Sequence, residues 1–254
     1  MLTTTVAQKW ITRWDRQQEG YLPDREERFT ALIDAVEVGT GRPDPLVLDL
    51  GCGPGSLSAR LLDRLPGATV VAIDTDPLLL ALGRGAHAGR PELRFADLDL
   101  RDPGWSAELD LDRPADAAVS TTALHWLAEH DLRKVYAELA SVLRPGALFL
   151  NGDHLDVGTP TLHRLERALT ERATHRRYGD DAPEDWRQWW DAAAADPALT
   201  GLIAARAEKN AAGHHGSESA HLALHTAALR DAGFGEIGTL WQHGNDRLLC
   251  AIRR

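Results

Sequence analysis

Two kinds of apolar pattern alternate along the middle of the chain. Short continuous runs of aliphatic and β-branched residues predict strands that are buried on both faces of a sheet. These runs lie at 46–50, 68–73, 93–96, 115–120 and 147–151. The segments between them place apolar residues three and four positions apart, which predicts amphipathic helices. This alternation predicts an α/β fold with a doubly wound, mostly parallel sheet and right-handed crossovers.

Helical patterns flank this central region on both sides. At the N-terminus they cover 5–18 and 24–39, and Asp24 is placed to cap the second helix. After the fifth strand the pattern predicts only helices until about residue 216. These helices are expected at 161–178, 184–195 and 197–212.

The chain closes with a helix and a hairpin. The helix is expected at 218–232, and the hairpin strands at 236–243 and 247–252 are joined by a Gly244-Asn245 turn. Five parallel strands and this antiparallel C-terminal hairpin make a seven-stranded sheet. We therefore divide the chain into an N-terminal helical flap (1–40), a core (41–157 and 217–254) and a helical insertion that forms a lid over the crevice (158–216).

A glycine-rich loop follows the first strand. Residues 46–55, Leu-Val-Leu-Asp-Leu-Gly-Cys-Gly-Pro-Gly, are typical of a buried strand that ends in a tight loop. Gly51, Gly53 and Gly55 allow conformations that residues with a Cβ avoid, and they let a ligand approach the main chain. Ser56 then opens a helix, so this edge of the sheet suits a nucleotide-type ligand. The glycine spacing is shorter than that of the dinucleotide fingerprint Gly-x-Gly-x-x-Gly.

Acidic residues stand at the end of the second strand. Asp74 follows Gly51 by 23 residues (74 − 51), a distance at which a carboxylate can accept hydrogen bonds from ribose hydroxyls. Asp76, just before Pro77, is expected to cap the next helix. These positions strengthen the prediction of a ligand that carries a ribose.

Composition excludes several classes of function. Apolar residues make up 43% of the 254 residues, enough for a packed core. The net charge of −10 argues against a nucleic-acid or anionic membrane partner. No apolar run reaches the length of a membrane span, and the first ten residues lack the pattern of a signal peptide. Two cysteines imply no disulfide framework, so we expect the cytoplasm as the location. We also expect a monomer or a homodimer.

Four motifs in order resemble the class I S-adenosylmethionine-dependent methyltransferases. They are Val47–Gly55, Ile73-Asp74, Asp97-Leu98 and the Leu143-Arg-Pro-Gly146 turn, within a resemblance that covers 45–151 and 220–252. The resemblance implies a Rossmann-like fold and S-adenosyl-L-methionine as cofactor. It also implies that the Asp97 carboxylate takes the adenine amine and the backbone beside it a ring nitrogen, with Asp99 as an alternative two residues later.

A finer resemblance is seen after the fourth strand. Ala123-Leu124-His125-Trp126 is similar to the small-molecule enzymes related to trans-aconitate methyltransferase. Methyltransferases that act on DNA bases carry an Asn/Asp-Pro-Pro-aromatic motif there, whereas this chain has Ser-Thr-Thr-Ala. This difference argues against a nucleic-acid base as acceptor.

These arguments give a set of candidate cofactor-binding residues. Two of them, Trp14 and Tyr21, lie on the predicted flap, where core packing is an equally good interpretation. The full set is Trp14, Tyr21, Asp49, Gly51, Cys52, Gly53, Gly55, Asp74, Thr75, Asp97, Leu98, Ser120 and Thr121.

Histidine is the natural general base near neutral pH. His125 lies where the chain leaves the central strand, and His154 follows the fifth strand, so both are catalytic candidates. The structural alternative for His125 is a helix-start residue bonded to backbone, and for His154 it is a loop histidine. A carboxylate acceptor needs no base, whereas a hydroxyl acceptor benefits from one. The candidate substrate-binding residues are His125, Trp126, Trp186 and Trp190, while Trp189 is expected to pack the lid against the core.

Clustered histidines raise the question of a metal site. His221 and His225 share a helical face, and His214 and His215 are close in sequence. The Glu that zinc proteases place after the first histidine is Leu222 here, so we expect no metal.

The sequence therefore predicts methyl transfer from S-adenosylmethionine to a small-molecule acceptor by in-line displacement. O-methylation of a carboxylate or hydroxyl is favoured over N- or C-methylation. The alternatives are a non-catalytic protein that binds S-adenosylmethionine or S-adenosylhomocysteine and an NAD(P)-dependent oxidoreductase.

Overall fold

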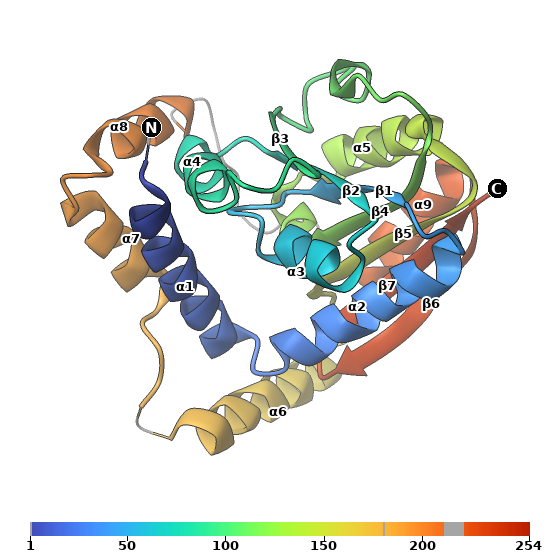
Figure 1. Cartoon of the computed structure of the whole chain (residues 1–254). Helices are drawn as coiled ribbons and strands as arrows, with labels where there is room; N and C mark the ends of the chain where they lie inside the picture. Colours follow the sequence, from blue (N-terminus) through green and yellow to red (C-terminus); the bar gives the residue numbers. More distant parts are fainter. Residues whose placement is uncertain (1, 180, 211–220) are drawn as a thin grey trace.

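The computed structural model describes residues 2–179, 181–210 and 221–254, and its centre is a seven-stranded sheet in the order β3-β2-β1-β4-β5-β7-β6 (Figure 1). The first five strands run parallel, and β7 is antiparallel to both β5 and β6. This arrangement confirms the predicted fold class. The strands are β1 (Leu46–Leu50), β2 (Thr69–Asp74), β3 (Leu93–Asp97), β4 (Ala115–Thr121), β5 (Leu143–His154), β6 (Phe234–His243) and β7 (Asp246–Arg253).

Helices cover both faces of the sheet. Apolar side chains of α2 and α3 pack on one face, and those of α5 and α9 pack on the other. The described helices are α1 (Thr4–Tyr21), α2 (Arg25–Thr40), α3 (Ser56–Arg64), α4 (Pro77–Ala86), α5 (Glu129–Val142), α6 (Pro160–Tyr178), α7 (Trp186–Ala195), α8 (Thr200–Asn210) and α9 (Leu222–Asp231). The start of the last predicted helix, at 218–220, lies outside the described residues.

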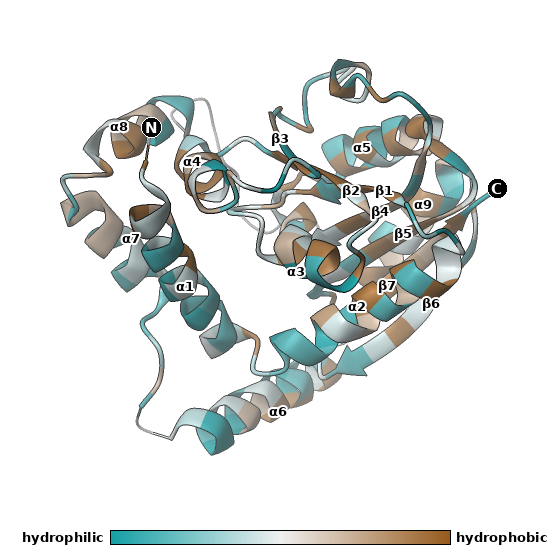
Figure 2. Ribbon diagram, in the orientation of Figure 1, coloured by the Kyte–Doolittle hydropathy of each residue, from teal (hydrophilic) through white to brown (hydrophobic). Residues whose placement is uncertain are grey.

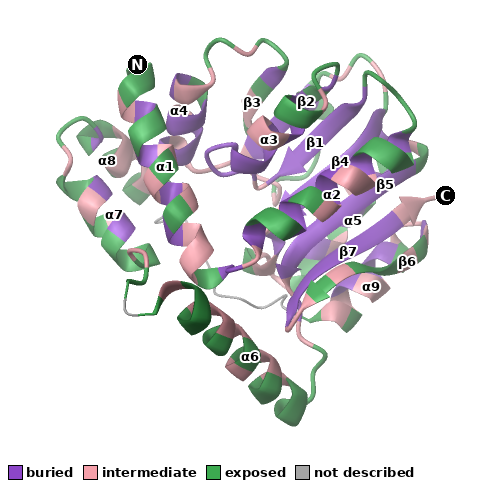
Figure 3. Cartoon of the chain, turned by 60° about the horizontal axis from the view of Figure 1, so that its bottom comes forward, coloured by how far each residue is buried: buried purple, intermediate pink, exposed green. Residues whose placement is uncertain are grey.

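The central strands are buried because they are apolar on both sides. In β1, Leu48 and Leu50 join the cluster under α5 and α9, whereas Val47 joins the cluster under α2 and α3. Figure 2 shows the same strands as mostly hydrophobic, and Figure 3 shows the middle of the sheet as buried. On one side of β1 lie β2 and then β3, and on the other side lie β4 and then β5, so the strand order reverses between β1 and β4. In such a sheet the ligand crevice lies outside the carboxyl ends of these two strands.

A third apolar cluster lies beside the sheet, where α1 packs against α4 and α7 (Figure 1). It is built around Trp10, Trp14 and Trp189, with leucines of α4 beneath them. Burial of these rings supplies a large apolar contact between segments that are far apart in the sequence. The N-terminal helix α1 is thereby packed together with α4, α7 and α8.

Two predicted caps have different outcomes. Asp76 caps α4, because its carboxylate accepts hydrogen bonds from the amides of Leu78 and Leu79. The prediction for Asp24 is wrong: it occupies the cap position of α2, but its carboxylate bonds to His243 on β6 instead. A long-range partner has replaced the local one.

Strand β5 differs from its predicted bounds. It begins at Leu143, immediately after α5 ends, and continues to His154, so the turn residues Arg144 and Gly146 belong to the strand.

Among the described residues, we find no helix with the length and apolar character needed to cross a membrane.

Candidate functional site

The glycine loop between β1 and α3 requires its glycines. Gly51, Gly53 and Gly55 have positive φ angles of 67°, 55° and 83°, which residues with side chains rarely adopt. Space is also short, since a Cβ on Gly51 would lie 2.3 Å from Cβ of Ala123, and one on Gly55 would lie 2.8 Å from the ring of Phe95. The loop is therefore held close to the crevice.

Hydrogen bonds fasten this loop to the end of β2. The amides of Gly51 and Cys52 donate to the carbonyl of Ile73 at 2.8 and 3.0 Å. The amide of Gly53 donates to Oδ2 of Asp74 at 2.7 Å. Asp74 thus lies beside the loop, as the sequence predicts.

The Asp74 carboxylate is surrounded by backbone amides. Its other oxygen accepts hydrogen bonds from the amides of Thr75 and Asp76 at 2.7 and 2.8 Å. Burial raises the pKa of Asp74, and the amide hydrogen bonds oppose that rise without cancelling it. These bonds fix the carboxylate at the strand tip, and its role toward ribose hydroxyls stays a prediction.

Asp49 on β1 and Cys52 within the glycine loop are both buried. Oδ2 of Asp49 accepts a 2.6 Å hydrogen bond from Oγ of Ser58, which ties β1 to α3. Burial, reinforced by the charge of Asp74, raises the pKa of Asp49 to about 7. Burial also raises the pKa of the Cys52 thiol well above its usual value, so Cys52 acts as a small apolar side chain.

The third strand tip carries the predicted adenine contact. Asp97 ends β3 beside Asp74, and Nζ of Lys209 on α8 lies 2.6 Å from its Oδ1. The amide of Leu98 donates to the carbonyl of Asp74 at 3.1 Å. The alternative carboxylate, Asp99, forms a 2.6 Å ion pair with Arg101. Roles for Asp97 and Leu98 stay predictions.

A second cation from α8 reaches the same edge. Nε of Arg206 lies 2.6 Å from Oδ2 of Asp76, and its guanidinium lies 3.7 Å from the ring centre of Trp190. The insertion therefore touches two successive strand tips. No local sequence pattern predicts either contact, because 112 residues separate Lys209 from Asp97.

The end of β4 forms the middle of the crevice. Oγ of Ser120 donates to the carbonyl of Leu50 at 2.8 Å, and Oγ1 of Thr121 accepts from Nη2 of Arg28 at 2.5 Å. Thr122 has a φ of 49°, in the left-handed region that non-glycine residues avoid. Strain of this kind is common where a chain is bent at a functional site.

His125 is paired with a buried carboxylate. Its Nδ1 lies 2.8 Å from Oδ1 of Asp153, and Asp153 is fully buried on β5. Burial opposes protonation of His125, but the charge and the hydrogen bond of Asp153 together outweigh it, so the pKa of His125 is raised. His125 in turn keeps the pKa of Asp153 below its usual value, against the effect of burial. Trp126 lies alongside, with ring centres 5.0 Å apart and 46% of its surface exposed.

His154 has a different environment, because successive side chains of a strand point to opposite faces. Burial lowers the pKa of His154, and its Nε2 has no hydrogen-bond partner within the described part of the chain. Its backbone amide, not its ring, bonds to Asp153. His154 lines a small cavity with Tyr21, Pro23, Asp24, Thr170, His243 and Asp246.

The tryptophans of the insertion pack on the flap. Ring centres of Trp186, Trp189 and Trp190 lie 5.4, 5.0 and 6.4 Å from that of Trp14. The Trp14 ring also reaches within 3.8 Å of the position of a Cβ on Gly53. Trp14 thus contacts both the lid and the glycine loop, so its two interpretations are compatible. Trp189 is fully buried, in keeping with a packing role.

Tyr21 joins the same two segments at the end of α1. Its hydroxyl accepts a 2.9 Å hydrogen bond from the amide of Trp186, and 45% of its surface is exposed. It lies at the cavity beside His154. Its role toward the cofactor stays a prediction.

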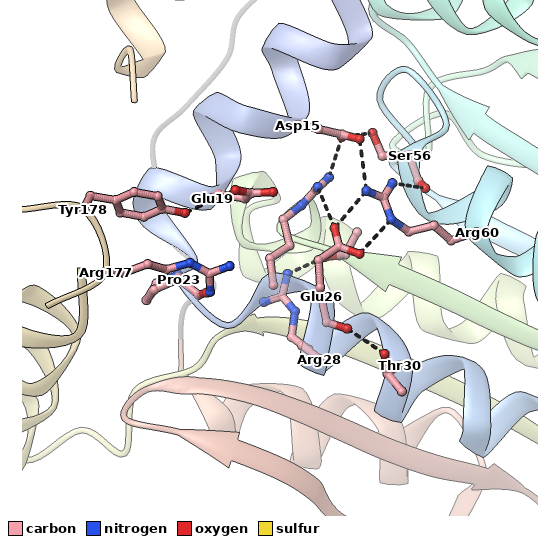
Figure 4. Close-up of polar contacts among 12 residues, drawn as sticks. Asp15, Glu19, Pro23, Glu26, Arg28, Thr30, Ser56, Arg60, Arg177 and Tyr178 are labelled. Carbon is pink, nitrogen blue, oxygen red and sulfur yellow. Dashed lines mark hydrogen bonds and ion pairs between the residues drawn. The ribbon is translucent and has the colours of Figure 1, made fainter. Parts of the chain in front are cut away.

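A polar network anchors the flap to the start of α3 (Figure 4). Oδ1 of Asp15 accepts hydrogen bonds from Oγ of Ser56 at 2.6 Å and from Nη2 of Arg25 at 3.0 Å. Oδ2 of Asp15 bonds to Arg60, which also pairs with Glu26 at 2.8 Å. The first residue after the glycine loop is therefore held by α1.

The histidines considered for a metal are placed differently from one another. The ring of His225 is buried in the core and bonds to the hydroxyl of Tyr136 at 2.6 Å, whereas His221 is exposed. His214 and His215 lie outside the described residues. Among the residues that are described, no group of three or more potential ligands is close enough for a metal ion.

Comparison with known proteins agrees with this geometry. Residues 47–146 match a family described as a methyltransferase domain. The chain is 32% identical to trans-aconitate 2-methyltransferase of Azoarcus sp. over 61% of its own length and 55% of the relative. It is also 32% identical to that of Methylobacterium radiotolerans over 62% and 50%. It spans about half the length of these curated relatives.

Solved structures share the fold. Magnesium protoporphyrin IX methyltransferase from Synechocystis PCC 6803, with bound SAH, has a TM-score of 0.57 at 18% identity, covering 96% of this chain and 94% of that one. Human N-acetylserotonin methyltransferase, in complex with SAM, has a TM-score of 0.54 at 17% identity, covering 89% and 51%. The likeness to these solved structures shows the fold, and residues 47–146 match a methyltransferase domain. Both findings agree with the resemblance of the chain to the class I S-adenosylmethionine-dependent methyltransferases.

Proposed function

We propose that this protein transfers the methyl group of S-adenosylmethionine to a hydroxyl oxygen of a small molecule. The observation that carries the proposal is the 2.8 Å contact between His125 and the buried Asp153 at the crevice. A hydroxyl is a weak nucleophile until its proton is removed, so a paired imidazole is useful there. A carboxylate acceptor would gain little from such a pair.

The geometry specifies how the imidazole would work. A proton on Nδ1 donates to Oδ1 of Asp153, which leaves Nε2 as the nitrogen that can accept a proton from the acceptor. Asp153 is itself fixed by a 2.8 Å hydrogen bond from the amide of His154. We retain His154 as a second catalytic candidate, although its ring is buried and faces the other side of β5.

The cofactor would occupy the crevice between the glycine loop and the strand tips. The glycine loop would present its backbone to the ligand, and Asp74 and Asp97 lie next to each other at the strand tips beside it. S-adenosylmethionine supplies a methyl group already activated by a positively charged sulfur. The protein has to orient the acceptor oxygen in line with that bond and exclude water.

Water exclusion is assigned to the segments outside the core. The packing of Trp14 on Trp186, Trp189 and Trp190 supports a flap (1–40) and a lid (158–216) that act together. Residues 211–216 of that lid lie outside the described part of the chain. Trp126, Trp186 and Trp190 are proposed to contribute acceptor contacts from this side.

A carboxylate acceptor is the second candidate, because the curated relatives are named for trans-aconitate. A cofactor-binding protein without turnover is the third. Location in the cytoplasm, absence of a nucleic-acid partner and a monomeric or dimeric state stay predictions.

Two measurements separate these functions. Calorimetry with S-adenosylhomocysteine and with NAD tests the cofactor, and we expect binding of the first alone. Methyl transfer to matched panels of phenols, alcohols and carboxylic acids tests the acceptor, and we expect turnover with hydroxyl compounds. Turnover with carboxylic acids alone would reject the hydroxyl proposal, and binding without any turnover would favour the non-catalytic one.

A further inference from the structure

Arg28 of α2 has a fully buried guanidinium near the acceptor side of the crevice. Its Nη1 lies 2.5 Å from Oδ1 of Asp246 on β7, and its Nη2 lies 2.5 Å from Oγ1 of Thr121 at the end of β4. A buried arginine is rare unless it is paired and serves a structural or functional need. The sequence analysis did not single it out.

The guanidinium lies directly on the strand that carries Asp153. A Cβ on Gly152 would be 2.9 Å from Nε and 3.0 Å from Cδ of Arg28, so only glycine fits there without displacement. Gly152 is paired with Thr121 across the β4–β5 boundary, and its carbonyl accepts the amide of Thr122 at 2.9 Å. Arg28 therefore touches the residue just before the partner of His125.

We propose that Arg28 is a positioning residue for the His125–Asp153 pair. Its guanidinium joins the ends of β4 and β7 across Gly152, and it holds a positive charge behind the two residues. The proposal rests on the proposed function of His125 as the base. It adds a residue from the N-terminal helices to the machinery of the core.

The Arg28 charge should change the pKa of His125 in a direction that can be tested. The charged groups that act on His125 are Asp153 from β5, which raises its pKa, and Arg28 from α2, which lowers it. Burial of the ring lowers this pKa too. Arg28 also lowers the pKa of His154, while Asp246 from β7 and Asp153 raise it. Removal of the positive charge should therefore leave more of His125 protonated at neutral pH and unable to accept a proton.

The experiment compares three variants with the wild-type protein. Arg28→Met combined with Asp246→Asn removes both members of the buried pair, so that no unpaired charge is left in the interior. Asp246→Asn alone is its reference, because these two variants differ only in the positive charge of Arg28. Arg28→Lys keeps the charge and loses the forked contact to Thr121. The pKa of His125 is measured by NMR titration, with its signal assigned through His125→Gln, and the pH profile of kcat/KM is recorded with a hydroxyl acceptor.

Relative to Asp246→Asn, the double variant should show the pKa of His125 and the acid limb of the profile moved up together by about half a unit to one unit. In Arg28→Lys both should stay within about 0.3 unit, while kcat falls because Thr121 is no longer held. An unchanged pKa in the folded double variant would overturn the proposal. A shift in the NMR titration without one in the profile would support Arg28 as positioning residue and reject His125 as the base.

Discussion

Nδ1 of His125 and Oδ1 of Asp153 lie 2.8 Å apart, which joins the connection after β4 to the end of β5. Because Asp153 is buried and also bonded to the amide of His154, it holds the imidazole in one orientation. In the proposed function, this pair removes a proton from the acceptor. The predictions below test the cofactor edge, the core and this pair.

Asp74→Asn should weaken the binding of S-adenosylhomocysteine by about 1–3 kcal/mol, because the lost charge leaves a ribose hydroxyl with a poorer partner. Asn keeps one acceptor oxygen, which can serve the amides of Thr75 and Asp76, whereas its NH2 group then faces the amide of Gly53. Thermal unfolding of the ligand-free variant therefore checks that the fold is intact. Calorimetry measures the effect, and Asp63→Asn on the exposed face of α3 is the control. Equal affinities for wild type and Asp74→Asn would remove the ribose assignment.

Asp49 should make stability depend on pH. Its folded pKa is raised to about 7, above an unfolded value of about 3.9, so folding favours the protonated carboxyl. The stabilisation is fully present below pH about 4 and is lost as pH rises through the folded pKa, at about 1.4 kcal/mol per unit.

Asp49→Asn removes this titration and keeps an acceptor for Ser58. Urea unfolding at several pH values should show the wild type losing stability relative to the variant between pH about 4 and about 7. If the free energies of unfolding of the two proteins changed with pH in parallel, Asp49 would be ionised in the folded state over this range.

Trp189→Ala should lower the free energy of unfolding by about 3–5 kcal/mol, because the ring is fully buried against Trp10 and Trp14. Trp186→Ala is the matched comparison, since 39% of its surface is exposed. It should cost less stability and raise the KM of the acceptor. Equal losses of stability would argue that both rings serve packing alone.

Gly152→Ala should destabilise the protein by about 1–3 kcal/mol, because the new Cβ would meet the buried guanidinium of Arg28. The same change made together with Arg28→Met and Asp246→Asn should have a smaller effect, since a methionine side chain is not held by Asp246 and Thr121 and can move aside. Thermal or chemical unfolding of the four proteins gives the coupling. An equal loss in both backgrounds would place the strain elsewhere.

Local patterns explain why much of the fold was predictable. The β1 run, the glycines after it and the Asp76-Pro77 cap depend on neighbours in sequence, and each has the expected structure. The strand order follows from right-handed crossovers and needs no side-chain detail. The predicted strand order also places the end of β2, with Asp74, beside the glycine loop, where Asp74 accepts the amide of Gly53.

The remaining features depend on partners that are distant in the chain. Asp24 bonds to His243, 219 residues away, so a sound local rule for caps failed. Asp153 could have been found, because β4 and β5 are neighbours in a doubly wound sheet and the residues after both strands meet at one edge. No local pattern marks Arg28, whose partners lie on β4 and β7.

The most direct test of the account is methyl transfer by His125→Gln, measured as the ratio of turnover on a hydroxyl acceptor to turnover on a carboxylate acceptor. Because the pKa of His125 is raised, wild-type kcat/KM on the hydroxyl acceptor should rise with pH through an inflection above 6.5. His125→Gln should abolish that inflection and reduce hydroxyl turnover about 10²–10⁴-fold, with little change on the carboxylate. An unchanged ratio, or equal losses on both acceptors, would contradict the role of His125 as the base.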